Sequence, residues 1–494
     1  MPRTFWVETL GCPKNQVDSD KLTGTMLADG LVPAAAPEGA DLVVVNTCAF
    51  IEEARQESVD VVLDLAERKP ATAELVVTGC LAERYGPELA DALPEADAVA
   101  GFGVPVTLGP TRRGALPVPA FDLLNLPRPT PAAPWAYVKV AEGCDRACGF
   151  CAIPSFRGRQ RSRSIASILA EVEGLAAGGV REVVLVAQDL ASFGRDQEHA
   201  SRSPGQSGRG SGRHVSGGGS RRIVPLVEAV ARRVDRVRLL YLYPSDLTDK
   251  LIDAICATGV PYFDLSLQHA SRPLLRRMRR WGDGDRFLRR IDDIRRRAPE
   301  AAFRSNFIVG YPGETEDDHD RLLSFVAAAD LDWCGFFAYS EEQGTYATQL
   351  DGQVEASVVQ ERLAELSQLQ DGITARRRDA LIGSVVEVLV DAPGVARSHR
   401  EAPEIDGIVS VPRDLPVGEL AKVTITGAAG PDLEGRLRPP APHRSRVLSP
   451  PVRGLPPAAR HAASGPASSA PPARYPPSAG DKKAASAFGR VEVF

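Results

Sequence analysis

Three cysteines lie close together in the stretch Ala141-Glu-Gly-Cys-Asp-Arg-Ala-Cys-Gly-Phe-Cys-Ala-Ile-Pro154, at C-x3-C-x2-C spacing. A structural zinc site usually needs four protein ligands, and the nearest histidine, His199, is far away in sequence. Three thiolates can instead hold a 4Fe-4S cluster and leave one iron with an open position. We therefore predict a cluster bound by Cys144, Cys148 and Cys151. A zinc knuckle or three incidental thiols are the alternatives.

The open iron suggests a specific chemistry. Such an iron can chelate the amino and carboxylate groups of S-adenosylmethionine (SAM) and pass an electron to its sulfonium, which releases a 5'-deoxyadenosyl radical. The C-x3-C-x2-C spacing is typical of radical-SAM enzymes. We therefore expect Cys144, Cys148 and Cys151 to be the catalytic cluster ligands.

The composition narrows the class of protein. The 494 residues allow about two to four domains, and the hydrophobic content of 43% supports a sizeable core. The net charge is −5, so the chain does not have the excess of Lys and Arg that is typical of proteins that bind nucleic acid through nonspecific phosphate contacts. We find no signal peptide and no apolar run that could span a bilayer, and we expect a cytoplasmic protein. Eight cysteines then favour metal or redox chemistry over disulfides.

Residues 1–104 are expected to form an N-terminal domain around a parallel sheet. Apolar runs typical of buried strands cover Thr4 to Thr9, Asp41 to Asn46 and Glu74 to Thr78. Helical patterns separate them, at Ser19 to Asp29 and Ile51 to Glu67. This alternation of strands and helices predicts βαβ units.

Each of these three strands is followed by a cysteine. The three are Cys12, Cys48 and Cys80. Because the carboxyl ends of parallel strands face one edge of a sheet, the thiols should converge there. A single cysteine at a strand end is more simply a small buried hydrophobe. Its repetition in three successive units favours a shared metal site, which the fold must assemble because the cysteines are far apart in sequence.

A second α/β domain is predicted for residues 135–352, after a linker rich in Pro and Ala at residues 105–134. Six apolar runs alternate with helical patterns, which predicts a partial, open (β/α)6 barrel. The runs are Trp135 to Val140, Glu182 to Ala187, Val237 to Leu242, Phe263 to Leu267, Phe303 to Val309 and Trp333 to Ala338.

Chemistry in parallel barrels collects at the carboxyl ends of the strands. The residues expected to contact SAM there are Phe150, Gln188, Asp189, Ser245, Gln268, Gly310 and Gly313. The two glycines could simply form a turn, and His269 is expected to be structural in preference to catalytic. Cys256 and Cys334 lie inside a helical and a strand pattern, so we predict that they are core thiols.

The remaining segments are predicted from composition and pattern. Residues 197–222 are rich in Gly, Ser and Arg, and we expect a disordered surface insertion that could also touch RNA. A connecting helix is predicted at 353–382 and a small antiparallel β-barrel at 383–438, of a type that binds oligonucleotides or peptides. Residues 439–494 are expected to be a disordered tail without an assigned function.

Together these motifs resemble the methylthiotransferases, which are radical-SAM enzymes with two 4Fe-4S clusters. The resemblance runs from about Phe5 to Leu437. It is carried by Thr9-Leu-Gly-Cys-Pro-Lys-Asn15, Val45-Asn-Thr-Cys-Ala-Phe-Ile51, Val77-Thr-Gly-Cys80, Ala141-Glu-Gly-Cys144, Phe150-Cys-Ala-Ile-Pro-Ser-Phe-Arg-Gly158, Leu267-Gln-His-Ala-Ser271 and Phe307-Ile-Val-Gly-Tyr-Pro-Gly-Glu-Thr315. It implies that Cys12, Cys48 and Cys80 hold an auxiliary cluster and that residues 383–438 form a TRAM-like domain.

Within the family, three segments are more similar to members that modify a ribosomal protein than to members that modify tRNA. They are Cys12-Pro-Lys-Asn15, Ile153-Pro-Ser155 and Glu401-Ala-Pro-Glu-Ile-Asp-Gly407. The resemblance implies methylthiolation of the β-carbon of an aspartate in small-subunit ribosomal protein S twelve, with an electron donor such as flavodoxin or ferredoxin and with neither DNA nor a membrane as partner. A tRNA adenosine methylthiotransferase is the alternative, or, from a different class, a non-enzymatic iron-sulfur or zinc RNA-binding protein.

The C-terminal module differs from the family pattern and is acidic. The segment from Gly427 to Gly435 lacks the aromatic-rich acidic residues that are usual in the family. The sequence therefore does not predict whether the last strand of the β-barrel forms. From Gly383 to Arg438 there are nine acidic and six basic residues. We expect this acidic face, including Glu401 and Glu404, to attract a basic ribosomal protein.

Overall fold

The computed structural model describes residues 2–106, 122–200 and 222–437. The predicted tail at 439–494, and most of the insertion predicted at 197–222, lie outside these residues. Within the described residues no helix is both long and apolar enough to cross a membrane.

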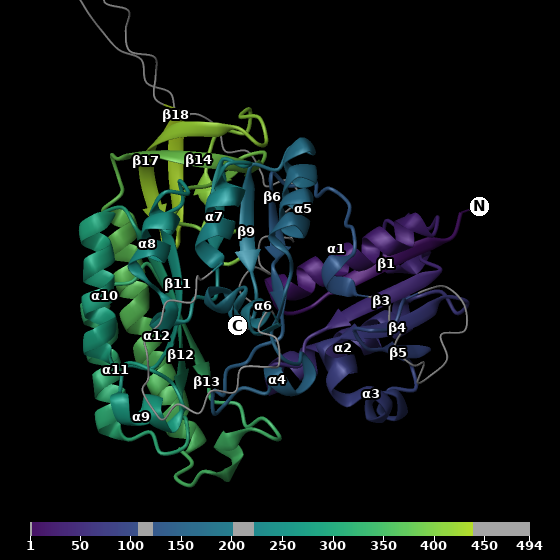
Figure 1. Ribbon diagram of the computed structural model, residues 1–494, viewed down its shortest axis with the longest axis horizontal. Helices are drawn as coiled ribbons and strands as arrows, with labels where there is room; N and C mark the ends of the chain where they lie inside the picture. The colour runs from purple at the N-terminus through teal and green to yellow at the C-terminus, as the bar shows by residue number, and fades with distance from the viewer. Residues whose placement is uncertain (1, 107–121, 201–221, 438–494) are drawn as a thin grey trace, which may run out of the picture. The chain divides into compact units, whose positions relative to one another are not determined.

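The N-terminal part is a parallel sheet, as the βαβ pattern predicts, and its strand order is β2-β1-β3-β4-β5. The short strands β2 and β5 add to the three predicted strands. All six residues of β3 are buried, which explains the uninterrupted apolar run in the sequence. The strands are β1 (Thr4–Thr9), β2 (Val32–Pro33), β3 (Leu42–Thr47), β4 (Glu74–Gly79) and β5 (Ala98–Ala100), and the helices are α1 (Pro13–Ala28), α2 (Glu52–Arg68) and α3 (Cys80–Ala92) (Figure 1).

Helix α1 begins six residues before the predicted start at Ser19. Pro13 occupies the first turn, where its fixed φ and missing N–H are tolerated. Apolar periodicity does not predict the first turns of this helix, because several of its buried side chains are polar. These are Lys14, Asn15, Asp18, Ser19 and Lys21.

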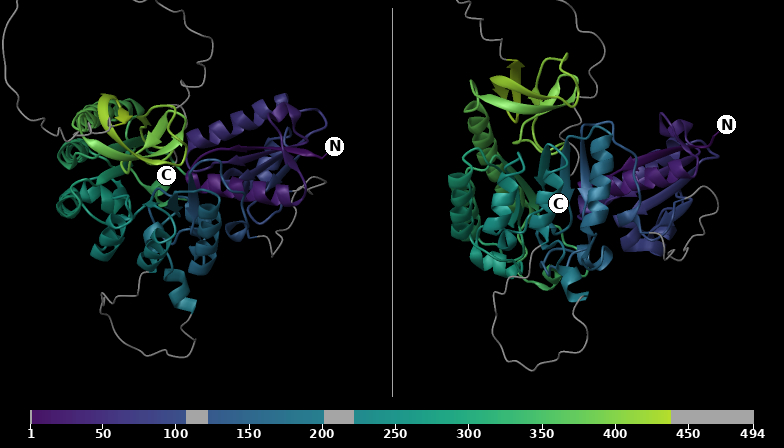
Figure 2. Two further views of the ribbon diagram at one scale, coloured as in Figure 1. Left: turned by 90° about the horizontal axis from the view of Figure 1, so that it is seen from above. Right: turned by 45° about the horizontal axis from the view of Figure 1, so that its top comes forward.

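The central part contains the six predicted strands as two three-stranded parallel sheets, in the orders β10-β9-β6 and β11-β12-β13. Helices lie on the outer side of these strands (Figure 2). The strands are β6 (Trp135–Lys139), β9 (Glu182–Val186), β10 (Arg236–Leu239), β11 (Tyr262–Gln268), β12 (Ala302–Val309) and β13 (Trp333–Ala338). The helices are α4 (Ile153–Phe156), α5 (Ile165–Ala177), α6 (Arg195–Ala200), α7 (Ile223–Ala231), α8 (Asp249–Cys256), α9 (Arg272–Arg277), α10 (Gly284–Arg297) and α11 (Glu316–Ala329).

An isolated bridge between Leu242 and Leu265 joins the two sheets, and β10 ends at Leu239, before the predicted end at Leu242. Tyr241 has a left-handed φ of 64°, which interrupts the strand. Its N–H donates to the carboxylate of Asp264 at 2.8 Å, in place of a bond to a neighbouring strand. A short hairpin of β7 (Ala141–Glu142) and β8 (Arg161–Ser162) frames the cysteine loop.

Helix α6 extends into the segment that composition assigns to the insertion. Gln197 lies in α6, and its amide donates to the backbone oxygens of Ser162 and Arg163. The prediction of a disordered loop is therefore wrong for residues 197–200, because a polar sequence can still form a helix when its side chains bond neighbouring backbone.

The C-terminal part consists of α12 (Ala356–Asp379) and a closed five-stranded barrel. The barrel strands are β14 (Val385–Ala392), β15 (Val395–Arg397), β16 (Val409–Ser410), β17 (Leu420–Ala429) and β18 (Asp432–Leu437). Only the pair β16–β18 is parallel, so the barrel is not wholly antiparallel. The last strand does form, paired to β17 across a tight turn at Gly430.

Glu401 does not belong to an exposed acidic face. Its side chain is fully buried, and its carboxylate accepts hydrogen bonds from Arg378 at 2.5 Å and from the Ser398 hydroxyl at 2.6 Å. The prediction that Glu401 attracts a basic partner is therefore wrong. Sequence alone does not show that an acidic residue in a loop has a buried arginine partner on α12.

Candidate functional site

The loop after β6 places Cys144, Cys148 and Cys151 on the wall of one cavity. Backbone bonds fix the loop: Cys144 N–H donates to Gly158 O at 3.0 Å, and Gly149 N–H donates to Met278 O at 2.8 Å. Gly143 has a φ of 76°, and a Cβ there would lie 2.2 Å from a backbone oxygen. Only glycine therefore fits at the start of this turn.

Four of the seven residues predicted to contact SAM line the same cavity. They are Phe150, Gln188, Asp189 and Gln268. Within the described structure, one buried side-chain oxygen of each of the last three, Gln188 Oε1, Asp189 Oδ1 and Gln268 Oε1, has no hydrogen-bond partner. Buried polar atoms are nearly always satisfied, so such a group points to a missing partner. A ligand with ammonium and hydroxyl groups, such as SAM, would supply donors.

Cations surround this cavity. Arg146 donates to Asp189 at 2.6 Å and also bonds Asp246, and its guanidinium lies over the ring of Tyr243. Arg280 donates to the sulfur of Cys148 at 3.3 Å. Burial raises the pKa of the Cys144 thiol to about 12. The thiols must lose their protons to bind metal, and neighbouring arginines favour the thiolate form.

The second cysteine set lines a second cavity. Cys12 precedes α1, Cys48 follows β3 and Cys80 begins α3, so three successive strand ends supply the thiols as predicted. Gly11 has a φ of 86°, and a Cβ there would lie 2.8 Å from the sulfur of Cys48. Burial raises the pKa of Cys48 and of Cys80.

Among residues 2–106, 122–200 and 222–437, no group of three or more His, Cys, Asp or Glu side chains is arranged to hold a single metal ion.

The two cavities adjoin each other. Four residues line both of them: Lys14, Phe50, Ile153 and Gln188. A group bound at this junction would face the Cys144 loop on one side and the three N-terminal cysteines on the other. The fold thus brings two chemically similar sites next to one shared space.

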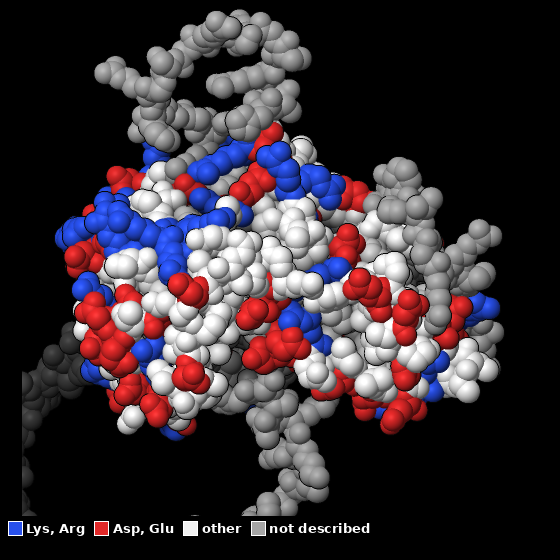
Figure 3. Space-filling model, turned by 90° about the horizontal axis from the view of Figure 1, so that it is seen from below, with Lys and Arg blue, Asp and Glu red and all other residues white. Residues whose placement is uncertain are grey.

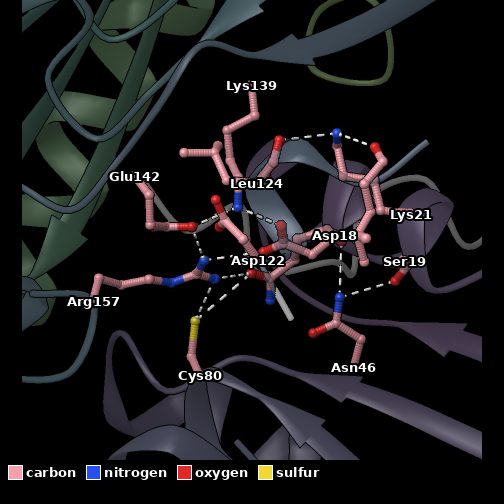
Figure 4. A network of polar contacts seen from close by, with 12 residues as sticks. Asp18, Ser19, Lys21, Asn46, Cys80, Asp122, Leu124, Lys139, Glu142 and Arg157 are labelled. Atoms are coloured by element: carbon pink, nitrogen blue, oxygen red, sulfur yellow. Dashed lines mark hydrogen bonds and ion pairs between the residues drawn. The ribbon is translucent and has the colours of Figure 1, made fainter. Parts of the chain in front are cut away.

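A buried ionic network connects Cys80 with Asp18 of α1 and with Glu142, which lies two residues before Cys144 (Figure 4). Arg157 donates to the sulfur of Cys80 at 3.0 Å and to the carboxylates of Asp18 at 3.0 Å and Glu142 at 3.1 Å. Lys139 bonds both of these carboxylates. Burial alone would raise the pKa of Glu142, but the charges of Arg157 and Lys139 outweigh it and lower the pKa to about 2.

Three of the predicted SAM contacts are not on the wall of this cavity. Ser245 lines a separate groove against α10. Gly310, with a φ of 81°, shapes the turn after β12, where its N–H donates to Glu314 at 2.5 Å. Gly313 approaches the side chain of Arg277 in the same turn.

The other predicted residues have structural surroundings. His269 is fully buried, its Nδ1 accepts from Ser271 N–H at 3.0 Å, and burial lowers its pKa to about 3. Cys256 and Cys334 lie in α8 and β13 and line neither cysteine cavity. Cys256 and Cys334 pack against the main core, whereas the structural role of His269 stays a prediction, because its buried Nε2 has no hydrogen-bond partner among the described residues.

Sequence reasoning did not identify the basic residues of the site: Lys14, Arg146, Arg157 and Arg280. Lys14 and Arg157 do stand inside the quoted motifs, as Cys-Pro-Lys-Asn and Phe-Arg-Gly. Their position inside these motifs could have indicated that Lys14 and Arg157 belong to the site. Their partners come from distant segments and leave no mark on local periodicity.

Comparison with known proteins gives three family matches. Residues 4–101 match the uncharacterized protein family UPF0004, residues 138–326 the Radical SAM superfamily and residues 382–437 the TRAM domain. The chain is similar to the ribosomal protein uS12 methylthiotransferase RimO of Kineococcus radiotolerans, with 40% identity over 87% of this chain and 96% of that protein. RimO of Moorella thermoacetica is 42% identical over 85% of this chain and 96% of that protein.

Among solved structures, the chain is similar to the radical S-adenosylmethionine methyltransferase TsrM of Kitasatospora setae. The identity is 15%, the TM-score is 0.47, and the match covers 75% of this chain and 89% of that one.

Proposed function

Because this chain belongs to the radical-SAM methylthiotransferase family that includes RimO, we propose that it methylthiolates the β-carbon of an aspartate in ribosomal protein uS12. The observation that carries this proposal is the pair of adjoining cavities, each lined by three cysteines. Methylthiolation of an unactivated carbon needs both hydrogen removal and sulfur delivery at one atom. Two adjacent sites can supply both.

We assign a 4Fe-4S cluster to each cysteine set. Cys144, Cys148 and Cys151 would hold the cluster that binds SAM, and Cys12, Cys48 and Cys80 would hold the auxiliary cluster. When bound, the first cluster and SAM supply a radical that removes a hydrogen atom, and the second cluster supplies sulfur. Arg280 and Arg157 donate to a sulfur of each set, which favours the anionic cluster ligands.

The chain's own residues would orient SAM and exclude water. Gln188, Asp189 and Gln268 offer buried acceptors for the ligand's donors. Phe150 gives the cavity an apolar wall. Arg146 holds Asp189 and Asp246 in place from the side of the cysteine loop. Reduction of the clusters requires an electron donor such as flavodoxin or ferredoxin, and a ribosomal substrate implies a cytoplasmic reaction.

A tRNA methylthiotransferase is the second candidate, and one observation favours it. Lys and Arg side chains gather over the α9 and α10 side of one face (Figure 3). A groove on α10 is lined by Arg286, Arg289, Arg290 and Arg296 together with Trp281, whose side chain is 43% exposed. Arginines beside an exposed aromatic ring suit nucleic acid. The same surface could bind the ribosomal RNA that surrounds the protein substrate, so it is also compatible with the first candidate.

The test uses anaerobically reconstituted protein and cysteine variants. Alanine at Cys144, Cys148 and Cys151 should abolish formation of 5'-deoxyadenosine. Alanine at Cys12, Cys48 and Cys80 should keep SAM cleavage but stop methylthiolation. The matched controls Cys256→Ala and Cys334→Ala should retain full iron content and activity, because those thiols lie outside both cavities.

Mass spectrometry of the products decides the substrate. We expect a methylthio group on an aspartate of uS12 and none on tRNA adenosine. Methylthiolated tRNA with unmodified uS12 would establish the second candidate instead. Full turnover by Cys48→Ala would contradict the assignment of the auxiliary cluster, and a lack of SAM cleavage by the unaltered protein would favour a non-enzymatic role.

A further inference from the structure

Lys14 occupies the junction of the two cavities. It is the second residue of α1, its side chain lines both cavities, and the residue is only 3% exposed. Its Nζ lies 3.4 Å from the centre of the Tyr241 ring. A buried ammonium therefore faces the space where the proposed substrate atom must reach both clusters.

Lys14 differs from the other buried lysines of the site in having no direct counter-ion. Lys139 bonds Asp18 and Glu142, and Lys21 donates to the backbone oxygen of Leu124 at 3.0 Å. Among the described residues, Lys14 makes no hydrogen bond and no ion pair with another side chain. Burial lowers the pKa of Lys14 and so does the nearby charge of Arg157, while the thiols of Cys12 and Cys80 and the carboxyl of Asp264 oppose these two effects from a distance.

An unpaired buried ammonium is costly, and proteins keep such a group where a ligand completes it. A carboxylate is the ligand that an ammonium in an enclosed cavity prefers, because a charge-assisted hydrogen bond forms there with little competition from water. Lysine suits one carboxylate oxygen on a narrow approach, since it presents a compact charge at the end of a slender chain.

We propose that the Lys14 ammonium binds the side-chain carboxylate of the substrate residue and so selects an acidic residue for modification. The inference rests on the proposed function and adds the group that recognises the substrate. A carboxylate held at the junction places its neighbouring carbon between the Cys144 loop and the three N-terminal cysteines. Lys14 would then be a substrate-binding residue that fixes which carbon reacts.

A rival role for Lys14 is to compensate the negative charge of the auxiliary cluster. Thiolates at Cys12 and Cys80 would provide that charge. The two roles differ in one measurable respect: only a substrate-binding lysine makes affinity depend on the charge of the substrate side chain.

The test is a double-mutant cycle on binding, measured with anaerobically reconstituted full-length chain and purified uS12. The target aspartate of uS12 is kept or replaced by asparagine, and the enzyme is unaltered or carries Lys14→Met. The unaltered enzyme should bind the aspartate form about tenfold more tightly, the size of one charge-assisted hydrogen bond. Lys14→Met should bind both forms equally, with unchanged cluster absorbance.

Lys21→Met is the matched control, because Lys21 is a buried lysine of the same helix that lines neither cavity. It should keep the tenfold preference. Retained preference in Lys14→Met, or equal binding of both uS12 forms by the unaltered enzyme, would overturn the proposal. Loss of the auxiliary cluster in Lys14→Met would also overturn it, in favour of charge compensation.

Failure of this inference and failure of the proposed function give different results. If only the inference is wrong, the unaltered enzyme still methylthiolates uS12 and Lys14→Met keeps its preference. If the proposed function is wrong, the unaltered enzyme leaves uS12 unmodified.

Discussion

Arg157 is the side chain that joins the two halves of the site. Its side chain is 3% exposed, and its guanidinium donates to Asn15, Asp18, Glu142 and the sulfur of Cys80. A planar group with several donors can serve all four acceptors, whereas a lysine ammonium could not do so in this geometry. The arginine therefore both aligns the N-terminal domain with the cysteine loop and places a positive charge beside the proposed auxiliary cluster.

Replacing Arg157 should change the reduction potential of that cluster. A hydrogen bond to a cluster sulfur stabilises the more negative, reduced form. Arg157→Gln should therefore lower the potential, by about 50 mV if the substitution removes about 1 kcal/mol of stabilisation from the reduced form. A redox titration followed by electron paramagnetic resonance measures this shift. Arg84→Gln is the control, because Arg84 pairs with Glu342 and bonds none of the cluster thiols; an equal shift there would contradict the role of Arg157.

At the scale of single residues, the sequence predicted which cysteines lie together but did not predict the cations beside them. Spacing within one loop identified Cys144, Cys148 and Cys151, and repetition after three strands identified Cys12, Cys48 and Cys80. Lys14 contacts Tyr241 and Arg157 bonds Asp18, both more than a hundred residues away in sequence, so local hydrophobic periodicity does not predict these contacts. Ser245 shows the converse error, since a position after a strand does not fix which way the following turn presents its side chain.

Among the elements, strands were predictable and α1 was not. The apolar runs matched β1, β3, β4, β6, β12 and β13 closely, because buried parallel strands leave nearly continuous hydrophobic stretches. Helix α1 instead turns Asn15, Asp18 and Lys21 toward buried polar partners. Local rules of amphipathicity fail where a helix carries a functional site.

The segment between α6 and α7 offers a test at the scale of elements. Its two ends are close together: the guanidinium of Arg222 bonds Gln197, and Arg222 also packs against Gly194. Replacing residues 201–221 by a linker of about four Gly and Ser residues should therefore leave the fold intact, and shortening the loop should change stability by only about 1 kcal/mol. We expect unchanged cluster content and SAM cleavage.

Extending that deletion through α6 provides the control. It would remove Arg195, which pairs with Asp246 at 2.7 Å, and Asp196, which accepts from Ser162 N–H at 2.8 Å. Thermal unfolding should then occur at a lower temperature. Loss of both clusters in the shorter deletion would show instead that residues 201–221 support the site.

At the scale of the whole molecule, buried ion pairs connect the C-terminal barrel to the radical-SAM domain. Glu182 of β9 bonds Arg238 at 2.8 Å and Arg397 of the C-terminal barrel at 3.3 Å. Arg378 bonds Glu401, and Arg304 bonds Asp406 at 2.9 Å. Some of the acidic residues counted in the C-terminal module, such as Glu401 and Asp406, form buried ion pairs at this interface. The net charge of the module therefore does not describe its surface.

The interface predicts a specific dependence of stability on acid. Burial would raise the pKa of Glu182, but Arg397, Arg238 and Arg236 outweigh it and lower the pKa to about 2. A carboxyl group whose pKa is lowered in the folded state stabilises the fold fully at pH values above its ordinary pKa of about 4.5. This stabilisation is lost as the pH falls from about 4.5 to about 2, the pKa in the folded state. For Glu182 the contribution is about 3 kcal/mol.

Glu182→Gln should therefore lower the free energy of unfolding near pH 7 by about 3 to 5 kcal/mol, because it leaves buried arginines without their counter-ion. Between pH 4.5 and 2 the variant should lose less stability than the unaltered chain, since it lacks the titrating carboxylate. Denaturant unfolding of the metal-free chain measures both effects without interference from acid-labile clusters. Glu387→Gln is the matched control: Glu387 lies 3.5 Å from Arg236 but is half exposed, and its loss should cost less than about 1 kcal/mol. Equal effects of the two substitutions at pH 7 would show that burial of the Glu182 pair does not hold the C-terminal barrel to the radical-SAM domain.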